Sequence, residues 1–281
     1  MKIFFKHIRS HLKPFYSENE VRDFSYLIVE KITGLSFSEM VLNKNIIFSP
    51  NQRNIADAFV DKLKNKFPIQ YLLGETDFYG LRFYVDENVL IPRPETEELV
   101  EWIASDYHPA AAFNFLDIGV GSGAIAVTLK HLFRNAAVDA FDISEPAIGV
   151  AKQNAKRNKT AISFHRIDIL QAPLIDKKWD IIVSNPPYIR DSEKRDMDTT
   201  VLDYEPHIAL FVPDGDDLLF YRQIALFARS HLNEKGCVYF EIHRDAGERV
   251  VKLLQSLHFR QVELRKDMSG NDRMIKAQRF H

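Results

Sequence analysis

The part of the sequence best suited to chemistry is Asn185-Pro186-Pro187-Tyr188, which follows an apolar run. Proline holds φ at about −65° and has no N–H, so two in succession make a stiff loop whose carbonyl oxygens can point into a site. The Asn185 side-chain oxygen and the Pro186 carbonyl can each accept one N–H of a flat –NH2 group. The Tyr188 ring can stack on that group and attract a cationic methyl donor. We therefore predict that Asn185, Pro186, Pro187 and Tyr188 catalyse methyl transfer to a planar amine.

Positioning must supply much of this catalysis, because the lone pair of an amide-type nitrogen is delocalised and makes a poor nucleophile. No strong general base stands out by its spacing, whereas in-line geometry alone can lower a barrier by several kcal/mol. The alternative, a rigid proline turn without chemistry, is disfavoured by the glycines and acids that precede it in the chain.

A second motif, Gly119-Val120-Gly121-Ser122-Gly123, connects a predicted strand at 113–118 to a helix predicted from Ala124. Closely spaced glycines let the backbone pass near a ligand. The start of the next helix offers unpaired N–H groups and positive potential. Ligands bind at this carboxyl edge of open α/β sheets, so we predict that the glycine loop lines a cofactor site.

Acidic residues at three strand ends extend this site. Asp142 ends the second predicted strand and can accept hydrogen bonds from ribose hydroxyls. After the third strand, Asp168 can accept from an adenine amine and Ile169 can pack on the adenine face. Asp117 lies before the first glycine and can hold the ammonium of a methionine group, directly or through water.

Two cofactors compete for this pattern. Gly119, Gly121 and Ala124 loosely satisfy the dinucleotide fingerprint G-x-G-x-x-G/A, which also places an acid about 20 residues further on. An acid at the position of Asp117 is more typical of S-adenosylmethionine sites, so we predict that this cofactor binds here. The alternative is a tight turn that binds no ligand. The predicted cofactor-binding residues are Asp117, Gly119, Val120, Gly121, Ser122, Gly123, Asp142, Asp168, Ile169 and Asn185.

The elements around these motifs alternate between strand and helix from residue 113 onward. Ser144 and Pro146 mark the start of a helix over 145–158. Such alternation predicts an α/β fold with a doubly wound, Rossmann-like parallel sheet. The predicted strands cover 113–118, 137–142, 162–167, 180–184, 236–242 and 260–265.

The first part of the chain is predicted to be a small helical bundle. Capping boxes begin at Ser17, Ser36 and Ser49, and Gly34 is suited to end a helix. An aromatic stretch around Gly80 predicts a β-hairpin. We therefore expect a helical domain at 1–76, a hairpin linker at 77–92 and a cofactor-binding domain at 93–281.

Composition excludes several other classes of protein. The 281 residues carry a net charge of −2, without the basic excess of a protein that neutralises duplex phosphates. The single cysteine, Cys237, allows no intrachain disulfide, and no apolar run reaches the roughly 20 residues that span a bilayer. No metal-ligand spacing is present. We expect a cytoplasmic protein without a metal, a membrane partner or stable nucleic-acid binding.

Three motifs together resemble one family. They are IPRPETEELV at 91–100, DIGVGSG at 117–123 and NPPYI at 185–189. With them the chain resembles the protein-(glutamine-N5) methyltransferases of the release factor type, the HemK/PrmC family. Further resemblance lies in PIQYLLG at 68–74, in 204–210, and in Asp267 to Arg273. The likeness covers nearly the whole chain.

The resemblance implies a helical N-terminal domain that docks a peptide chain release factor and a class I methyltransferase domain behind it. It implies that Asn185–Tyr188 hold the glutamine of the release factor GGQ motif, and that S-adenosylmethionine donates the methyl group. The NPPY motif is shared with adenine-N6 and rRNA guanine-N2 methyltransferases, and a sister group methylates glutamine in a ribosomal protein. These substrates are the alternatives, together with a nucleotide-binding module that is no enzyme.

Overall fold

The computed structural model describes residues 2–42, 47–171 and 175–280 and divides into two compact units. The first unit comprises the chain up to Glu75 together with Asp198–Tyr204. The second unit comprises Thr76–Met197 and the chain from Glu205 onward. Among the described residues, no helix combines the length and apolarity needed to cross a bilayer.

The first unit is helical, as the capping signals predict. Ser17 and Ser49 each accept a hydrogen bond from the third helical residue and form complete capping boxes. Gly34, with φ of 72°, ends the second helix in the left-handed conformation that favours glycine. The helices are α1 (Lys2–Leu12), α2 (Glu18–Thr33), α3 (Phe37–Leu42), α4 (Pro50–Lys64), α5 (Ile69–Leu73) and the distant α9 (Thr199–Tyr204).

The sequence did not predict that α9 belongs to this unit. The Tyr204 hydroxyl donates to the carbonyl oxygen of Asn65 at 2.8 Å, and the Tyr204 and Phe67 rings meet edge to face. A segment that follows the Asn-Pro-Pro-Tyr motif in the chain therefore packs with the N-terminal helices.

The β-hairpin consists of β1 (Glu75–Phe78) and β2 (Leu81–Tyr84). Both turn residues, Tyr79 and Gly80, have positive φ, the geometry that matches the twist of a two-residue hairpin. Phe78 and Phe83 are buried in the core of the second unit. The hairpin expected as a linker is thus part of the second unit.

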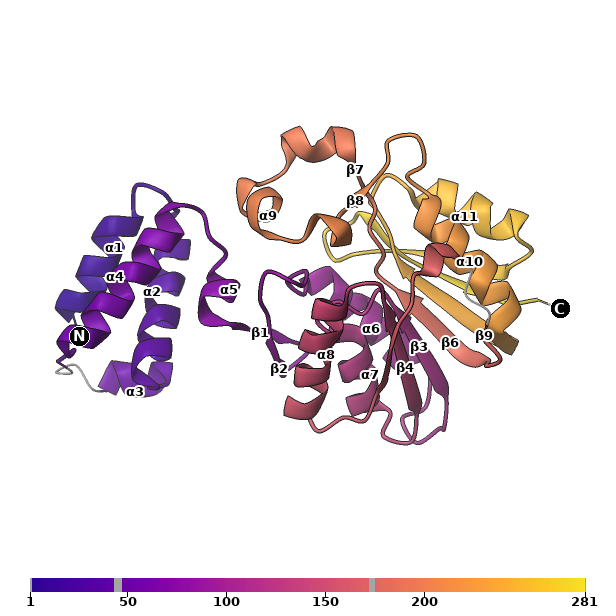
Figure 1. Ribbon diagram of the computed structural model, residues 1–281, viewed down its shortest axis with the longest axis horizontal. Coiled ribbons are helices and arrows are strands. Elements are labelled where there is room, and N and C mark those ends of the chain that lie inside the picture. The colour runs from indigo at the N-terminus through magenta and orange to yellow at the C-terminus, as the bar shows by residue number, and fades with distance from the viewer. Residues whose placement is uncertain (1, 43–46, 172–174, 281) are drawn as a thin grey trace. The chain divides into compact units, whose positions relative to one another are not determined.

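The second unit is built on a central sheet that has seven strands in the described part of the chain, in the order β10-β11-β9-β6-β3-β4-β5 (Figure 1). Strands β9, β6, β3, β4 and β5 pair in parallel, as predicted. The strands are β3 (Asn114–Ile118), β4 (Ala137–Asp142), β5 (Ser163–Arg166), β6 (Trp179–Ser184), β9 (Leu232–Glu241), β10 (Arg260–Lys266) and β11 (Asp272–Gln278).

The prediction of an all-parallel sheet is wrong at β11, which was not predicted and pairs antiparallel with both β9 and β10. The chain reverses over residues 267–271, where Gly270 adopts a φ of 86°. A tight turn suffices to join antiparallel strands, whereas a parallel connection needs a long crossover.

Helices cover both faces of the sheet, as a doubly wound fold requires (Figure 1). One face packs on α6 (Pro94–Asp106), α7 (Ala124–Leu132) and α8 (Glu145–Arg157). The other face packs on α10 (Leu219–His231) and α11 (Gly247–Ser256). Short elements complete the unit: η1 (Ile169–Gln171), β7 (Ile189–Arg190), η2 (Asp191–Asp196), η3 (His207–Ala209) and β8 (Phe211–Val212).

Candidate active site

A cavity of about 250 Å³ lies in the second unit, where the loops that follow β3, β4 and β6 meet. This is the carboxyl edge at which open α/β sheets bind ligands. Of the predicted residues, the wall contains Gly119, Val120, Gly121, Ser122, Asp142, Asp168, Ile169, Asn185, Pro186 and Pro187. Asp117, Gly123 and Tyr188 are not part of the wall.

The glycine loop follows β3 in a conformation that needs glycine. Gly119, Gly121 and Gly123 all have φ between 51° and 83°, the left-handed region. The N–H groups of Gly119 and Val120 donate to the Phe141 carbonyl oxygen at 2.9 and 3.0 Å, which ties the loop to β4. A Cβ atom on Gly123 would lie 3.2 Å from the Cβ of Ala151, so this glycine lets α7 and α8 approach.

The acids at the strand ends lie in the cavity wall. Asp142 accepts from the Gly121 N–H at 2.9 Å and from the Ser144 N–H at 2.9 Å. Burial raises the pKa of Asp142, and these backbone hydrogen bonds oppose the rise. Asp168 accepts from the Leu170 N–H at 2.9 Å, beside the buried Ile169. Backbone donors thus hold both carboxyl groups against the cavity.

Asp117 is buried behind the glycine loop, with 1% of its surface exposed. One carboxyl oxygen accepts from the Ala126 N–H at 3.1 Å, while Oδ1 has no hydrogen-bond partner among the described residues. Burial raises the pKa of Asp117 to about 8. An orphaned, buried acceptor of this kind fits a cationic group better than it fits an empty turn.

The Asn-Pro-Pro corner lies beside the glycine loop. A Cβ atom placed on Gly119 would be 4.0 Å from the carbonyl oxygen of Asn185, and both residues line the same cavity. The fourth parallel strand therefore brings the predicted catalytic residues Asn185, Pro186 and Pro187 to the predicted cofactor residues. This juxtaposition is what methyl transfer between two bound groups requires.

Tyr188 is placed differently from its neighbours. Its hydroxyl donates to Glu241 Oε1 at 3.2 Å, and its ring packs among the side chains beside α10. Burial raises the pKa of the Tyr188 phenol, which therefore stays a hydrogen-bond donor at neutral pH. The stacking role of Tyr188 stays a prediction, and the structure assigns its hydroxyl to Glu241.

The side chains that support Asn185 were not among the predicted site residues. Asn185 Nδ2 donates to Thr96 Oγ1 at 3.2 Å, and Thr96 Oγ1 donates to Glu241 Oε2 at 2.6 Å. Thr96 belongs to the IPRPETEELV segment and lines the cavity, while Glu241 ends β9 and is fully buried. The signal available in the sequence was an acid directly after the apolar run from Cys237 to Phe240.

The other resembling segments also converge on this edge of the sheet. Arg93 forms an ion pair of 2.6 Å with the buried Glu205, which also accepts from the Ile91 N–H. Arg273 pairs with Asp267 at 3.1 Å, and its charge lowers the pKa of Glu241 against the effect of burial. Segments far apart in the chain therefore support one cavity wall.

No cluster of three metal-ligating side chains occurs in the described ranges. His243 lies 3.4 Å from Glu193, and burial lowers the pKa of this histidine against the opposing charges of Glu193 and Asp245.

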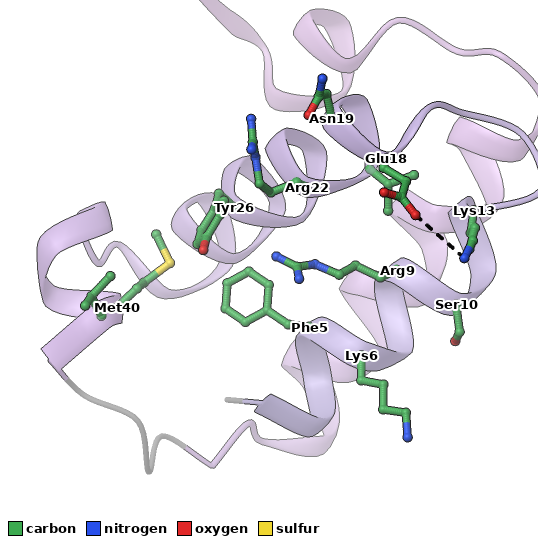
Figure 2. A pocket seen from close by; sticks show the side chains of 12 residues that line it. Phe5, Lys6, Arg9, Ser10, Lys13, Glu18, Asn19, Arg22, Tyr26 and Met40 are labelled. Carbon is green, nitrogen blue, oxygen red and sulfur yellow. Dashed lines mark ion pairs between the residues drawn. The ribbon is translucent and has the colours of Figure 1, made fainter.

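The helical unit has a separate groove of about 850 Å³ between α1, α2 and α3 (Figure 2). Its centre is the Arg9 guanidinium, 5.5 Å from the Phe5 ring centroid and 5.9 Å from that of Tyr26. The Arg9 Nε atom is buried and has no hydrogen-bond partner in the described part of the chain. Four basic side chains and one acidic side chain line the groove: Lys6, Arg9, Lys13, Arg22 and Glu18.

The fold and the cavity define a class I, S-adenosylmethionine-dependent methyltransferase. Residues 96–203 match the family described as Methyltransferase small domain, and residues 4–74 match the PrmC N-terminal domain. The ribosomal protein L11 methylase of Lactobacillus delbrueckii subsp. bulgaricus has a similar fold: TM-score 0.51, 22% identity, covering 70% of this chain and 84% of that one.

The chain belongs to the release factor glutamine methyltransferase family. The release factor glutamine methyltransferase of Flavobacterium psychrophilum is 45% identical, over 95% of this chain and 94% of the relative. That of Bacteroides thetaiotaomicron is 40% identical, over 97% of this chain and 98% of the relative.

Proposed function

We propose that this protein methylates the side-chain amide nitrogen of the glutamine in the GGQ motif of a peptide chain release factor. The observation that carries the proposal is the shared cavity of the Asn-Pro-Pro corner and the glycine loop. Family membership supports the same substrate, since the similar proteins are named for it.

S-adenosylmethionine, when bound, supplies a methyl group on a cationic sulfur. The residues present fit this cofactor. Asp142, Asp168 and Ile169 would hold the ribose and adenine, the glycine loop would approach the methionine group, and Asp117 would face its ammonium. The orphaned Oδ1 of Asp117 supports this assignment, because a buried carboxyl oxygen gains most from a cation.

Asn185 and Pro186 would orient the target amide. The Asn185 side-chain oxygen and the Pro186 carbonyl would each accept one N–H of the glutamine –NH2, which directs the nitrogen toward the methyl donor. The rigid proline backbone keeps both acceptors in place without a conformational cost at each turnover. No group has to remove a proton before transfer in this arrangement.

The helical unit would dock the protein substrate. Its cationic groove supports this role, because basic side chains around Phe5 and Tyr26 suit an acidic, partly apolar segment of a partner protein. A release factor as substrate would place the reaction in the cytoplasm.

The test is mass spectrometry of a purified release factor after incubation with the protein and S-adenosylmethionine. We expect a mass increase of one methyl group on the GGQ peptide, and a loss of turnover of at least about 100-fold in Asn185→Ala with an unchanged melting temperature. A ribosomal protein, rRNA and DNA in the same assay test the alternative substrates. Methylation of any of these but not of the release factor would refute the proposal.

A further inference from the structure

The side chains behind Asn185 form a chain of hydrogen bonds that joins three elements. Asn185 follows β6, Thr96 lies in the first turn of α6 and Glu241 ends β9. The link from Asn185 Nδ2 to Thr96 Oγ1 is 3.2 Å, and the link from Thr96 Oγ1 to Glu241 Oε2 is 2.6 Å. Thr96 is 4% exposed and Glu241 is 1% exposed, so the bond between these two residues is shielded from solvent.

The direction of these bonds follows from the donors that surround Glu241. Tyr188 donates to Oε1 and Thr96 donates to Oε2, so both carboxyl oxygens act as acceptors. A hydroxyl has one hydrogen to donate, and Thr96 donates it in the hydrogen bond to Glu241. Thr96 can therefore only accept from Asn185, and the Asn185 group that it accepts from must be the NH2.

The remaining end of the Asn185 amide is its oxygen. With Nδ2 held by Thr96, Oδ1 is the end left for a substrate in the cavity that Asn185 and Thr96 both line. A side-chain amide can turn by 180° with little steric change, which would exchange an acceptor for a donor. A donor at that place would face the NH2 of the target and repel it.

We infer that Thr96 and Glu241 are positioning residues for methyl transfer, which hold the Asn185 amide with its oxygen toward the substrate –NH2. Thr96 acts on Asn185 directly, and Glu241 acts through Thr96 by accepting the hydrogen bond of its hydroxyl. Tyr188 belongs to the same group because its hydroxyl occupies the other oxygen of Glu241. The inference rests on the proposed function, since it assigns an orientation to the acceptor of the target amide.

The accepting role of both Glu241 oxygens rests on the two hydroxyl donors that contact them. Burial is the largest effect on this carboxyl and raises its pKa, whereas the hydrogen bond from Thr96, the charge of Arg273 and the hydrogen bond from Tyr188 oppose the rise. Arg273 is itself held by Asp267 at 3.1 Å and donates to the Ile242 carbonyl oxygen. The C-terminal hairpin thus provides the cation that favours the accepting form of Glu241.

The experiment compares Thr96→Val with Thr96→Ser. Valine has the shape of threonine but cannot bond either neighbour, and serine restores the hydroxyl. For Thr96→Val we expect kcat to fall roughly 100-fold, as for a small misplacement of a reacting group, with an unchanged KM for the GGQ peptide and unchanged affinity for S-adenosylhomocysteine. Thr96→Ser should turn over at nearly the wild-type rate.

A second readout is independent of turnover. The side-chain amide signal of Asn185 in a 15N-labelled sample can be assigned from its absence in Asn185→Ala. We expect slow exchange of its NH2 protons with solvent in the wild type and in Thr96→Ser, and fast exchange in Thr96→Val. Should Thr96→Val fail to fold, Thr96→Cys against Thr96→Ser provides the same comparison, because the two differ by one atom and sulfur is the weaker acceptor.

The outcomes separate the inference from the proposed function. If the wild type methylates the peptide and Thr96→Val does so at the same rate, the positioning role is wrong. It is also wrong if Thr96→Ser is as slow as Thr96→Val, since the hydroxyl would then not matter. If the wild type methylates no release factor, the proposed function fails, and the exchange of the Asn185 amide still decides how that side chain is held.

Discussion

At Asp117 the effects of burial and charge oppose each other. It is 1% exposed, and its Oδ1 has no hydrogen-bond partner among the described residues. A buried carboxyl without full hydrogen bonding is destabilising in its charged form, so the pKa rises to about 8. Burial therefore favours the protonated form of Asp117 in the free protein, and a bound cation would favour the ionised form.

This linkage predicts that cofactor affinity depends on pH. If Asp117 faces the ligand ammonium, binding favours the ionised carboxyl and releases a proton below pH 8. Affinity for S-adenosylhomocysteine should then rise between pH 6 and pH 8, by at most about tenfold per pH unit. Isothermal titration calorimetry between pH 6 and pH 8 measures this change in affinity.

Asp117→Asn is the matched control for this prediction, because it keeps the shape and removes the titration. Its affinity should be lower than that of the wild type at pH 8 and should change little with pH, and any remaining slope reports titration of the ligand itself. Equal slopes in the two proteins would show that Asp117 does not face the ammonium.

At the residue scale the sequence predicts which side chains reach the cavity better than it predicts what holds them. Three of the predicted site residues lie at or just after the ends of parallel strands: Asp142, Asp168 and Asn185. The order of strands and helices in the sequence therefore suffices to place them at the same edge of the sheet. Thr96 and Glu241 contact each other across 145 residues of chain, and Thr96 contacts Asn185 across 89. Such pairs depend on how strands and helices pack, which local patterns do not encode.

The glycine loop shows at the scale of elements how backbone geometry shapes the site. Gly123 caps α7 with a φ of 83°, and a Cβ atom there would lie 3.2 Å from Ala151 Cβ in α8. Gly149, in the same α8, is exposed, and a Cβ atom on it would contact nothing within 4 Å. Gly123 is therefore required for the close approach of two helices, whereas Gly149 is not required by any neighbouring atom.

We predict opposite effects on stability for alanine at these two positions. Gly123→Ala should lower the free energy of unfolding by about 1–3 kcal/mol, because a left-handed φ is strained for alanine and the helices must separate. Gly149→Ala should raise it by about 0.5–1 kcal/mol, because alanine is the better residue inside a helix. Urea unfolding measures both, and a loss of stability in Gly149→Ala as large as in Gly123→Ala would contradict this account.

The sequence predicts elements well where the local signal is strong. Strand β4 and the start of α8 behind Ser144 match the structure, because a short, mainly apolar segment and a side-chain cap are both local signals. Strand β11 was missed, since its polar and apolar residues are mixed and its place is set by pairing with β9 and β10. Its antiparallel direction depends on the turn at Gly270.

The whole molecule consists of two units with different charge and different cavities. The helical unit holds eleven Lys/Arg and ten Asp/Glu, with Asp198 and Asp203 of its distant segment included, so its net charge is +1, whereas the whole chain has a net charge of −2. Helix α9 joins that unit from a distant part of the chain, which no local pattern predicts. Substrate docking and chemistry can then be tested separately.

The cationic groove of the helical unit provides that test. We predict that neutralising Arg9 and Arg22 together, as Arg9→Gln/Arg22→Gln, raises KM for a full-length release factor severalfold. Arg22 forms a surface ion pair with Asp23, and glutamine keeps part of the Arg9 stem over Phe5 and Tyr26, so the fold should persist. Kinetics with the full-length substrate at low and high salt measure the effect.

The control removes two positive charges from the same unit outside the groove, as Lys31→Gln/Arg53→Gln, since both residues are exposed and neither lines it. A general effect of net charge would change KM equally in the two double variants, whereas docking in the groove affects only the first. A short GGQ peptide lacks the rest of the release factor that would dock in the groove, so its KM should be the same in all three proteins. If the groove variant impaired the peptide as strongly as the full-length release factor, the helical unit would not be the docking site, and recognition would have to lie in the methyltransferase unit.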